Sequence, residues 1–343
     1  MNKPKIFCKN FNGVMDGILK SEEFEFILDP READALVLWQ DTRGEFAELC
    51  RMNNEYLHKP AIIVQHGAGA TRDYEHPMKC DLLGTKFCCW GEHDYERLVR
   101  QGNGAKGIIT GSPLINQLKP KEKHEDKNIV FIPIITTHEE PANIITFYEL
   151  KKMELDFSQK NIIKHKDELI TQWKPSILDP ENFDEGFIPY HDINKNFRLI
   201  SKLTTMHDKN LYLGSVSLSN VLGATHIEDC VRLLQQTDLV VGMVESTFQM
   251  LAMAMDIPVV ICNEWEFKIY GHDQKDYSKC DHIKTDGAVY ADLKDLRTTI
   301  EQELSNPERL KEERKKTVLR ELGDITSDPV KNIIKVIKES ING

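Results

Sequence analysis

Residues able to bind a phosphate or move a proton follow several short apolar runs of this sequence. Glu245, Ser246 and Thr247 follow the run 239–241 after three intervening residues and precede a helix expected over residues 248–255. The first N–H groups of a helix have no partner within the helix and attract anions, so this turn suits a phosphate. A serine at this place is also a common helix N-cap, and a purely structural role is the less favoured alternative for this turn.

His66 lies in the glycine-containing turn 65–69 (QHGAG), directly after the apolar run 60–64. Gly67 and Gly69 permit a tight turn and allow a ligand to approach the backbone closely. An imidazole at this place can act as a general base on an acceptor hydroxyl or donate a proton to a leaving phosphate. The alternative is a histidine that only forms hydrogen bonds within its own turn.

Two further strand ends in the second half of the chain carry polar or basic side chains. Thr137 and His138 follow a long apolar run, and Lys164 and His165 close another. A lysine beside an imidazole can neutralise a pyrophosphate. Thr137 and His138 can hold a phosphate or cap the helix that they open. Taken alone, Lys164 and His165 are compatible with an ordinary surface pair.

The remaining candidates are acceptor or turn contacts in the first half of the chain: Gly67, Gly69, Asp73, His93 and Ser112. Ser112 stands in a tight Gly-Ser-Pro turn that can be structural or can contact a ligand. Asp73 and His93 show no HxxxH or DxD spacing, so we expect no metal site. The sequence also lacks GxGxxG and GxxxxGK[ST], the signatures of dinucleotide and P-loop sites, and we expect no bound cofactor.

Strand-like and helix-like segments alternate along the chain and must position these residues. Such alternation predicts right-handed βαβ units and parallel sheets, hence an α/β fold. Besides a strand that ends over residues 27–30, we expect strands at 33–39, 60–64, 87–90, 107–110, 129–135, 161–165, 211–213, 239–241 and 259–261. We expect helices at 45–54, 94–101, 143–155, 197–207, 248–255, 293–322 (interrupted near residue 306) and 328–340.

The polar, charged segment 119–127 (KPKEKHEDK) has the composition of a linker. It divides the chain into a first domain over 1–120, a linker over 121–127 and a second domain over 128–322, with a final helical segment over 323–343. Both domains are expected to be Rossmann-like.

Composition and charge limit the function classes. The 343 residues carry a net charge of −11, which argues against a surface that tracks nucleic acid over its whole extent. No apolar run approaches the ~20 residues that a transmembrane helix needs, and the N-terminus lacks the apolar core of a secretory signal. The eight cysteines form no CxxC pair. We therefore expect a cytoplasmic protein with reduced cysteines.

Four stretches resemble the two-domain GT-B glycosyltransferases, and within them surface-polymer enzymes of the CDP-glycerol glycerophosphotransferase and UDP-N-acetylglucosamine 2-epimerase type. The stretches are AIIVQHGAG, GIITGSPL, IVFIPIITTHEE with NIIKHKDE, and TDLVVGMVESTFQMLAMAMDIPVVI. The last is the most specific, because it is similar to the donor-site segment of that family. One departure is that the helix after Ser246 lacks the glutamate that the family usually carries before an alanine.

The resemblance implies two Rossmann-like domains that face each other across a cleft, with a nucleotide-activated donor held mainly by the second. Ser246 and Thr247 would then contact the donor phosphates, and Glu245 the ribose or sugar hydroxyls. Lys164, His165, Thr137 and His138 would line the same pocket. His66 would face the reacting carbon from the first domain, and the terminal helix would cross back to that domain.

The favoured function is therefore transfer of a sugar, or of a polyol phosphate, from a nucleotide-activated donor to a hydroxyl acceptor without a bound metal. The acceptor could be a glycan, a polyol phosphate or a modified DNA base, as in phage DNA glycosyltransferases. A DNA acceptor would need a basic surface, for which Arg43, Arg51, Arg72, Lys79 and Lys86 are the available residues. Two alternatives stay open: a non-hydrolysing sugar-nucleotide epimerase and a binding protein without activity.

Overall fold

The computed structural model describes residues 3–10, 13–42, 44–68, 81–122, 128–132, 210–213, 227, 231, 234–242, 247–262, 267–269, 272–274, 286–291 and 295–343. The chain divides into two compact units. The first contains Met1–Leu118 together with Lys316–Gly343, and the second contains Lys119–Lys315. The C-terminal segment therefore belongs to the same unit as the N-terminus.

The first unit is built on a six-stranded sheet in which every described pairing is parallel. Its strands are β1 (Lys5–Cys8), β2 (Glu25–Ile27), β3 (Ala35–Leu38), β4 (Ala61–Val64), β5 (Lys86–Cys89) and β6 (Gly107–Ile109). Their order across the sheet is β2-β1-β3-β4-β5-β6. All residues of β3 and β4 are buried, which is typical of a parallel sheet covered on both faces.

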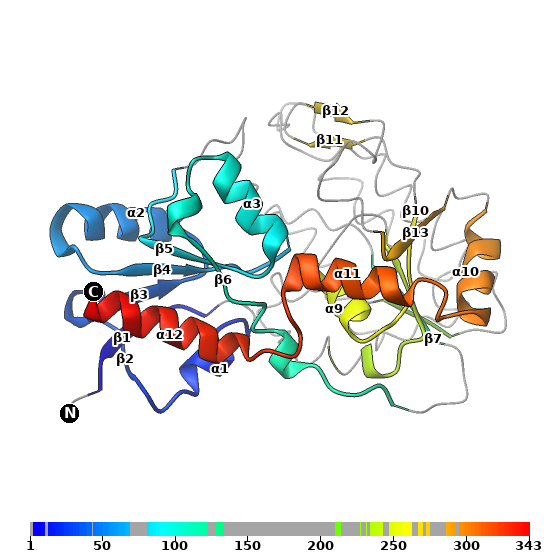
Figure 1. The fold of residues 1–343 in the computed structure, drawn as a ribbon, viewed down its shortest axis with the longest axis horizontal. Coiled ribbons are helices and arrows are strands. Elements are labelled where there is room, and N and C mark those ends of the chain that lie inside the picture. Colours follow the sequence, from blue (N-terminus) through cyan, green and yellow to red (C-terminus); the bar gives the residue numbers. More distant parts are fainter. Residues whose placement is uncertain are drawn as a thin grey trace, which may run out of the picture. The chain divides into compact units, whose positions relative to one another are not determined.

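Helices cover both faces of this sheet (Figure 1). One face carries α2 (Gly44–Met52), continued by the π-helical turn η2 (Asn53–Leu57), and α3 (Glu92–Arg100). The other carries α1 (Asp16–Leu19) and the terminal α12 (Pro329–Asn342). On the α2–α3 face, Cys50 and Leu98 pack on strand residues such as Leu36, Ile63 and Phe87.

The second unit contains a five-stranded parallel sheet in the order β13-β10-β9-β7-β8. Its strands are β7 (Asn128–Ile132), β8 (Asn210–Leu213), β9 (Leu239–Gly242), β10 (Val259–Cys262) and β13 (Ala288–Ala291). A separate antiparallel pair is formed by β11 (Phe267–Ile269) and β12 (His272–Gln274). Among the helices of its described residues are α9 (Thr247–Ala254), α10 (Leu296–Ser305) and α11 (Lys311–Leu322), and α11 contains the boundary between the units.

An ion pair joins α11 to the turn between α9 and β10. The Arg314 guanidinium donates to Asp256 Oδ1 from Nη2 (2.6 Å) and Nε (3.0 Å), and to the Pro307 carbonyl (2.7 Å). The Arg314 side chain is 1% exposed, whereas that of Asp256 is 35% exposed. Asp256 has a positive φ of 59°, a conformation that most residues avoid. The arginine thus holds a turn that the helix-to-strand connection requires.

The prediction of an α/β protein with parallel sheets is confirmed. The short strands β1, β11, β12 and β13 and the one-turn helix α1 were not predicted from the sequence. Expected elements at 143–155, 161–165 and 197–207 lie outside the described residues. In the part of the chain that the structure describes, no helix is both long and apolar enough to pass through a bilayer.

Candidate functional site

Several predicted site residues lie at the carboxyl edge of the first sheet, where parallel α/β sheets commonly bind ligands. His66 follows β4, His93 opens α3 just beyond β5, and Ser112 follows β6 by three residues. Trp39, directly after β3, lies beside His66 at this edge. Because β3, β4, β5 and β6 are neighbours in the sheet, these residues come from adjacent strand ends.

The imidazole of His66 is held by the strand end next to its own. Its Nδ1 lies 2.9 Å from the carbonyl oxygen of Trp39, and its ring packs against the Trp39 indole edge-on, with centroids 4.9 Å apart. The indole in turn packs edge-on against Phe46 of α2 at 5.2 Å. A carbonyl oxygen can only accept, so Nδ1 carries the proton of the neutral ring and Nε2 carries the lone pair. Nε2 is therefore the basic nitrogen.

His93, expected to contact an acceptor, instead pairs with the C-terminal segment. Its Nδ1 lies 2.7 Å from Glu321 Oε1, and both side chains are less than 10% exposed. Arg320 extends the cluster, with Nε 3.0 Å from the same carboxylate oxygen. The structure thus gives His93 a role in fastening the end of α11 to the edge of the first sheet.

Ser112 is also engaged by the C-terminal segment. Its N–H donates to the Leu322 carbonyl (2.8 Å), and the residue is fully buried. The adjacent Gly111 has a positive φ of 86° and packs on Pro329. The turn at Ser112 therefore receives the segment between α11 and α12, which favours the structural interpretation of this residue.

Gly91 allows the backbone of the C-terminal segment to approach the edge of the first sheet closely. A Cβ at this position would lie 2.1 Å from the carbonyl oxygen of Arg320, a backbone atom that cannot rotate away. Gly91 has an ordinary φ of −132°, so its backbone conformation suits any residue. The constraint at this position is steric.

Replacing Gly91 by alanine is therefore expected to lower the free energy of unfolding by ~1–3 kcal/mol, the usual effect of overpacking. The measurement is denaturant unfolding of the variant and the wild-type protein. Gly104→Ala is the matched control, because its Cβ would mainly meet the side chain of Val99, which is 49% exposed and can move. Equal stability of the two variants would contradict the steric role of Gly91.

In the second unit, Thr247 is the first residue of α9, which follows β9. This position agrees with the expected strand–turn–helix unit, and α9 is almost wholly buried. The other donor candidates, Glu245, Ser246, Lys164, His165, Thr137 and His138, lie outside the described residues. So do Gly69 and Asp73 of the first unit.

The described residues were compared with the needs of a metal site and of a reactive thiol. No group of three or more His, Cys, Asp or Glu side chains is placed to hold a metal ion there. Burial raises the pKa of the Cys50 and Cys88 thiols to about 12, so at neutral pH these thiols are protonated and poorly nucleophilic. The same holds for Cys8, with a pKa of about 12.

Three residues that the sequence analysis did not single out shape the surroundings of His66: Trp39, Gln65 and Asp94. A polar residue between a buried strand and a histidine was a usable signal for Gln65. Trp39 and Asp94 carried no such signal, because the contact of Trp39 with His66 and that of Asp94 with Gln65 depend on the order of the strands. Glu321 is 228 positions from His93, and that pairing was beyond any local pattern.

No protein-family profile matches the sequence, and no curated protein matches it. Solved structures share its fold. MnaA of S. aureus, in a structure with UDP, superposes with a TM-score of 0.51 at 12% identity, over 98% of this chain and 96% of that one. A structure of the wall teichoic acid polymerase TagF with CDPG gives 0.53 at 11% identity, over 99% and 89%. The chain therefore has the two-domain GT-B fold that the sequence predicted.

Proposed function

We propose that this protein transfers a sugar, or a polyol phosphate, from a nucleotide-activated donor to a hydroxyl acceptor, with His66 as the general base. The observation that carries the proposal is the Nδ1 contact of His66 with the Trp39 carbonyl (2.9 Å), which leaves Nε2 as the basic nitrogen. A base at the carboxyl end of a central parallel strand is well placed to act on a bound ligand.

In the sugar-transfer reaction, the acceptor oxygen attacks the anomeric carbon of the donor while His66 Nε2 takes the hydroxyl proton. The bond between that carbon and the phosphate oxygen breaks, and the nucleoside diphosphate leaves with the electron pair. The N-terminus of α9, with Glu245, Ser246 and Thr247, is the proposed contact for the donor, since helix N-terminal N–H groups stabilise phosphate charge. Lys164, His165, Thr137 and His138 are proposed to assist there.

The choice of donor class is supported by the fold neighbours, one solved with UDP and the other with CDPG. At 11–12% identity, the ligands of these neighbours do not identify the donor of this chain, and the donor is to be determined by direct assay. Both uridine and cytidine nucleotides are therefore the first candidates to test.

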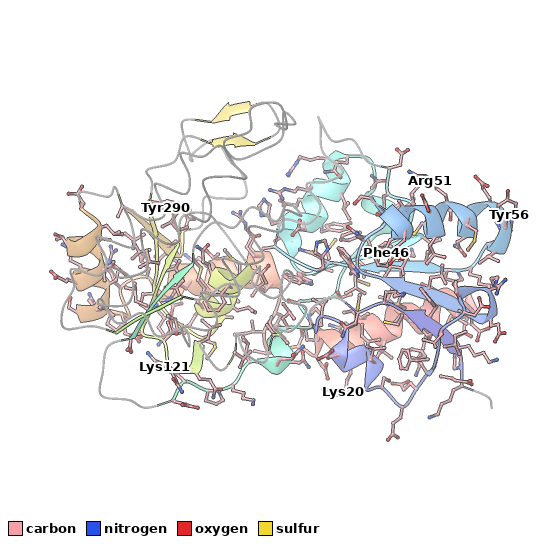
Figure 2. The ribbon with its side chains drawn as sticks, turned by 180° about the vertical axis from the view of Figure 1, so that it is seen from behind. Lys20, Phe46, Arg51, Tyr56, Lys121 and Tyr290 are labelled. Carbon is pink, nitrogen blue, oxygen red and sulfur yellow. The ribbon has the colours of Figure 1, made fainter. Side chains whose placement is uncertain are left out.

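A glycan or polyol acceptor is proposed in preference to DNA, because the net charge of −11 disfavours a surface that tracks nucleic acid. Of the five basic residues considered for a DNA surface, the structure describes Arg51 and Lys86. Lys86 begins β5, at the edge of the sheet opposite to His66. Arg51 lies in the last turn of α2, five residues after Phe46, which packs near His66 through Trp39 (Figure 2).

The test is an assay of each donor with and without acceptors, followed by mass spectrometry of donor and acceptor. The proposal predicts acceptor-dependent gain of one sugar, or of one polyol phosphate, by a glycan-like or polyol acceptor. Conversion of the donor sugar without any acceptor would favour an epimerase. Transfer to hydroxymethylated DNA alone would correct the acceptor class. Binding of a donor without any turnover would support the non-enzymatic alternative.

A further inference from the structure

The side chain of Gln65 is a buried amide with a hydrogen bond to each of three segments. Its Nε2 donates to Asp94 Oδ2 (2.6 Å) and to the Gly67 carbonyl (2.8 Å), and its Oε1 accepts from the Trp90 N–H (2.7 Å). Gln65 is 0% exposed and Asp94 is 1% exposed. Nε2 thus faces two acceptors and Oε1 faces a donor, and only one orientation of the amide satisfies all three.

Hydrogen bonds of Gln65 fix the backbone on both sides of His66. The Gln65 N–H donates to the Cys88 carbonyl (3.1 Å), which fixes the backbone before the histidine to the neighbouring strand. The Gln65 side chain then reaches forward to the Gly67 carbonyl and fixes the backbone after it. His66 is therefore held on both sides by the same residue, while its ring is held by the Trp39 carbonyl.

Asp94 anchors the amide from the first turn of α3. Its other carboxylate oxygen lies 3.8 Å from Arg97 Nη1, and the Arg97 side chain is 1% exposed. A hydrogen bond to an ionised acceptor is about twice as strong as one between neutral groups. The Asp94 carboxylate, which faces Arg97 on α3, thus strengthens the hydrogen bond that fixes the Gln65 amide.

We infer that Gln65 is a positioning residue for His66, and that Asp94 acts through Gln65. The catalytic consequence rests on the proposed function, in which His66 is the base. A shift of about 1 Å in a reacting group can cost ~10²-fold in rate, so a loosened turn would lower turnover strongly. Binding of the donor, assigned to the second unit, would not change.

The test replaces Gln65 by methionine, which has similar length but forms none of the three bonds. Gln117→Met is the matched control, because the Gln117 amide also donates to a backbone carbonyl, that of Gly13 (2.9 Å), in the same unit. The first measurement needs no substrate: ¹⁵N NMR of the histidine rings, with the His66 signals identified by their absence in His66→Asn. The second is kcat and the donor KM.

In the wild-type protein, His66 should show the neutral form protonated at Nδ1, with Nε2 unprotonated. Gln65→Met should bring the two ring nitrogen shifts toward each other, as expected for a mixture of tautomers, and should lower kcat ~10²-fold with donor KM unchanged. Gln117→Met should change neither. Unaltered His66 signals and unaltered kcat in a folded Gln65→Met protein would overturn the inference.

Two further variants keep the inference testable if Gln65→Met does not fold. Asp94→Asn retains an acceptor for Gln65 but removes its charge, and should shift the His66 signals in the same direction by less. No shift in Asp94→Asn would then count against the inference.

Gln65→Glu combined with Asp94→Asn should restore the hydrogen bond between positions 65 and 94, and with it the stability of the protein. It should not restore the hydrogen bond to the Gly67 carbonyl. Recovery of kcat in that double variant would contradict the role given to the Gly67 contact.

The two arms separate failure of this inference from failure of the proposed function. If the wild-type protein transfers nothing, the kinetic arm is void, and the NMR arm alone decides whether Gln65 positions His66. If the wild-type protein is active but Gln65→Met changes neither readout, the inference fails while the proposed function stands.

Discussion

Replacement of His66 by asparagine is expected to lower the turnover number by ~10²–10⁴-fold, the usual contribution of a general base. Asparagine can still donate from its amide to the Trp39 carbonyl, so the turn should keep its conformation. It has no nitrogen lone pair at the position of Nε2 that could take a proton. The donor KM should stay near the wild-type value, because the proposed donor contacts lie in the second unit.

The measurement is steady-state kinetics of transfer, with unfolding curves to show that the variant is folded. His58→Asn is the matched control. His58 is exposed and has a positive φ of 53°, a conformation that asparagine tolerates well. Turnover in His58→Asn should equal that of the wild-type protein. A folded His66→Asn protein with wild-type turnover would exclude His66 as the base.

Replacement of Asp256 by alanine is expected to lower the free energy of unfolding of the second unit by about 3 kcal/mol, because it leaves the buried Arg314 guanidinium without its carboxylate. Breaking such a pair costs more than the pair itself contributes, since the remaining charge stays away from water. Lys311 Nζ, 2.9 Å from Asp256 Oδ2, would lose the same partner but is more exposed and should matter less.

A series at Asp256 separates the ion pair from the backbone strain at φ 59°. Glycine removes the carboxylate but adopts this conformation readily, so Asp256→Gly should be about 1 kcal/mol more stable than Asp256→Ala. Asp29→Ala is the control, because its partner Arg31 is exposed; loss of this pair together with the Asp29 cap of η1 should cost only about 1 kcal/mol. Denaturant unfolding measures all of these. An Asp256→Ala protein as stable as Asp29→Ala would contradict the role of the pair.

Much of the fold could be predicted because buried strands of a parallel sheet are short, continuous apolar runs. Strands β3, β4, β9 and β10 each followed from such a run, and the helix expected over 328–340 corresponds to α12. Asp328, the N-cap of α12, accepts a hydrogen bond from the Lys331 N–H, so the predicted start of the helix has a physical cause. Strands β1 and β13 were missed because four residues with a polar or small member resemble a loop.

A site residue could be predicted only where its immediate neighbours in the sequence indicate a function. His66, between a buried strand and a glycine, was such a case. The partners that define its chemistry, Trp39 and the buried Gln65–Asp94 bond, depend on which strands are neighbours and on where α3 begins. His93 shows the converse, since a histidine near the same edge proved to pair with Glu321 from the far end of the chain.

A thermal-shift screen of the wild-type protein against UDP-, GDP-, CDP- and dTDP-linked donors tests whether the folded protein binds a nucleotide-activated donor. A ligand that binds the folded state at 100 times its Kd adds about 2.7 kcal/mol, which raises the Tm by several degrees. We expect such a rise in Tm with at least one donor, in His66→Asn as well as in the wild-type protein. No shift with any donor at millimolar concentration would contradict it.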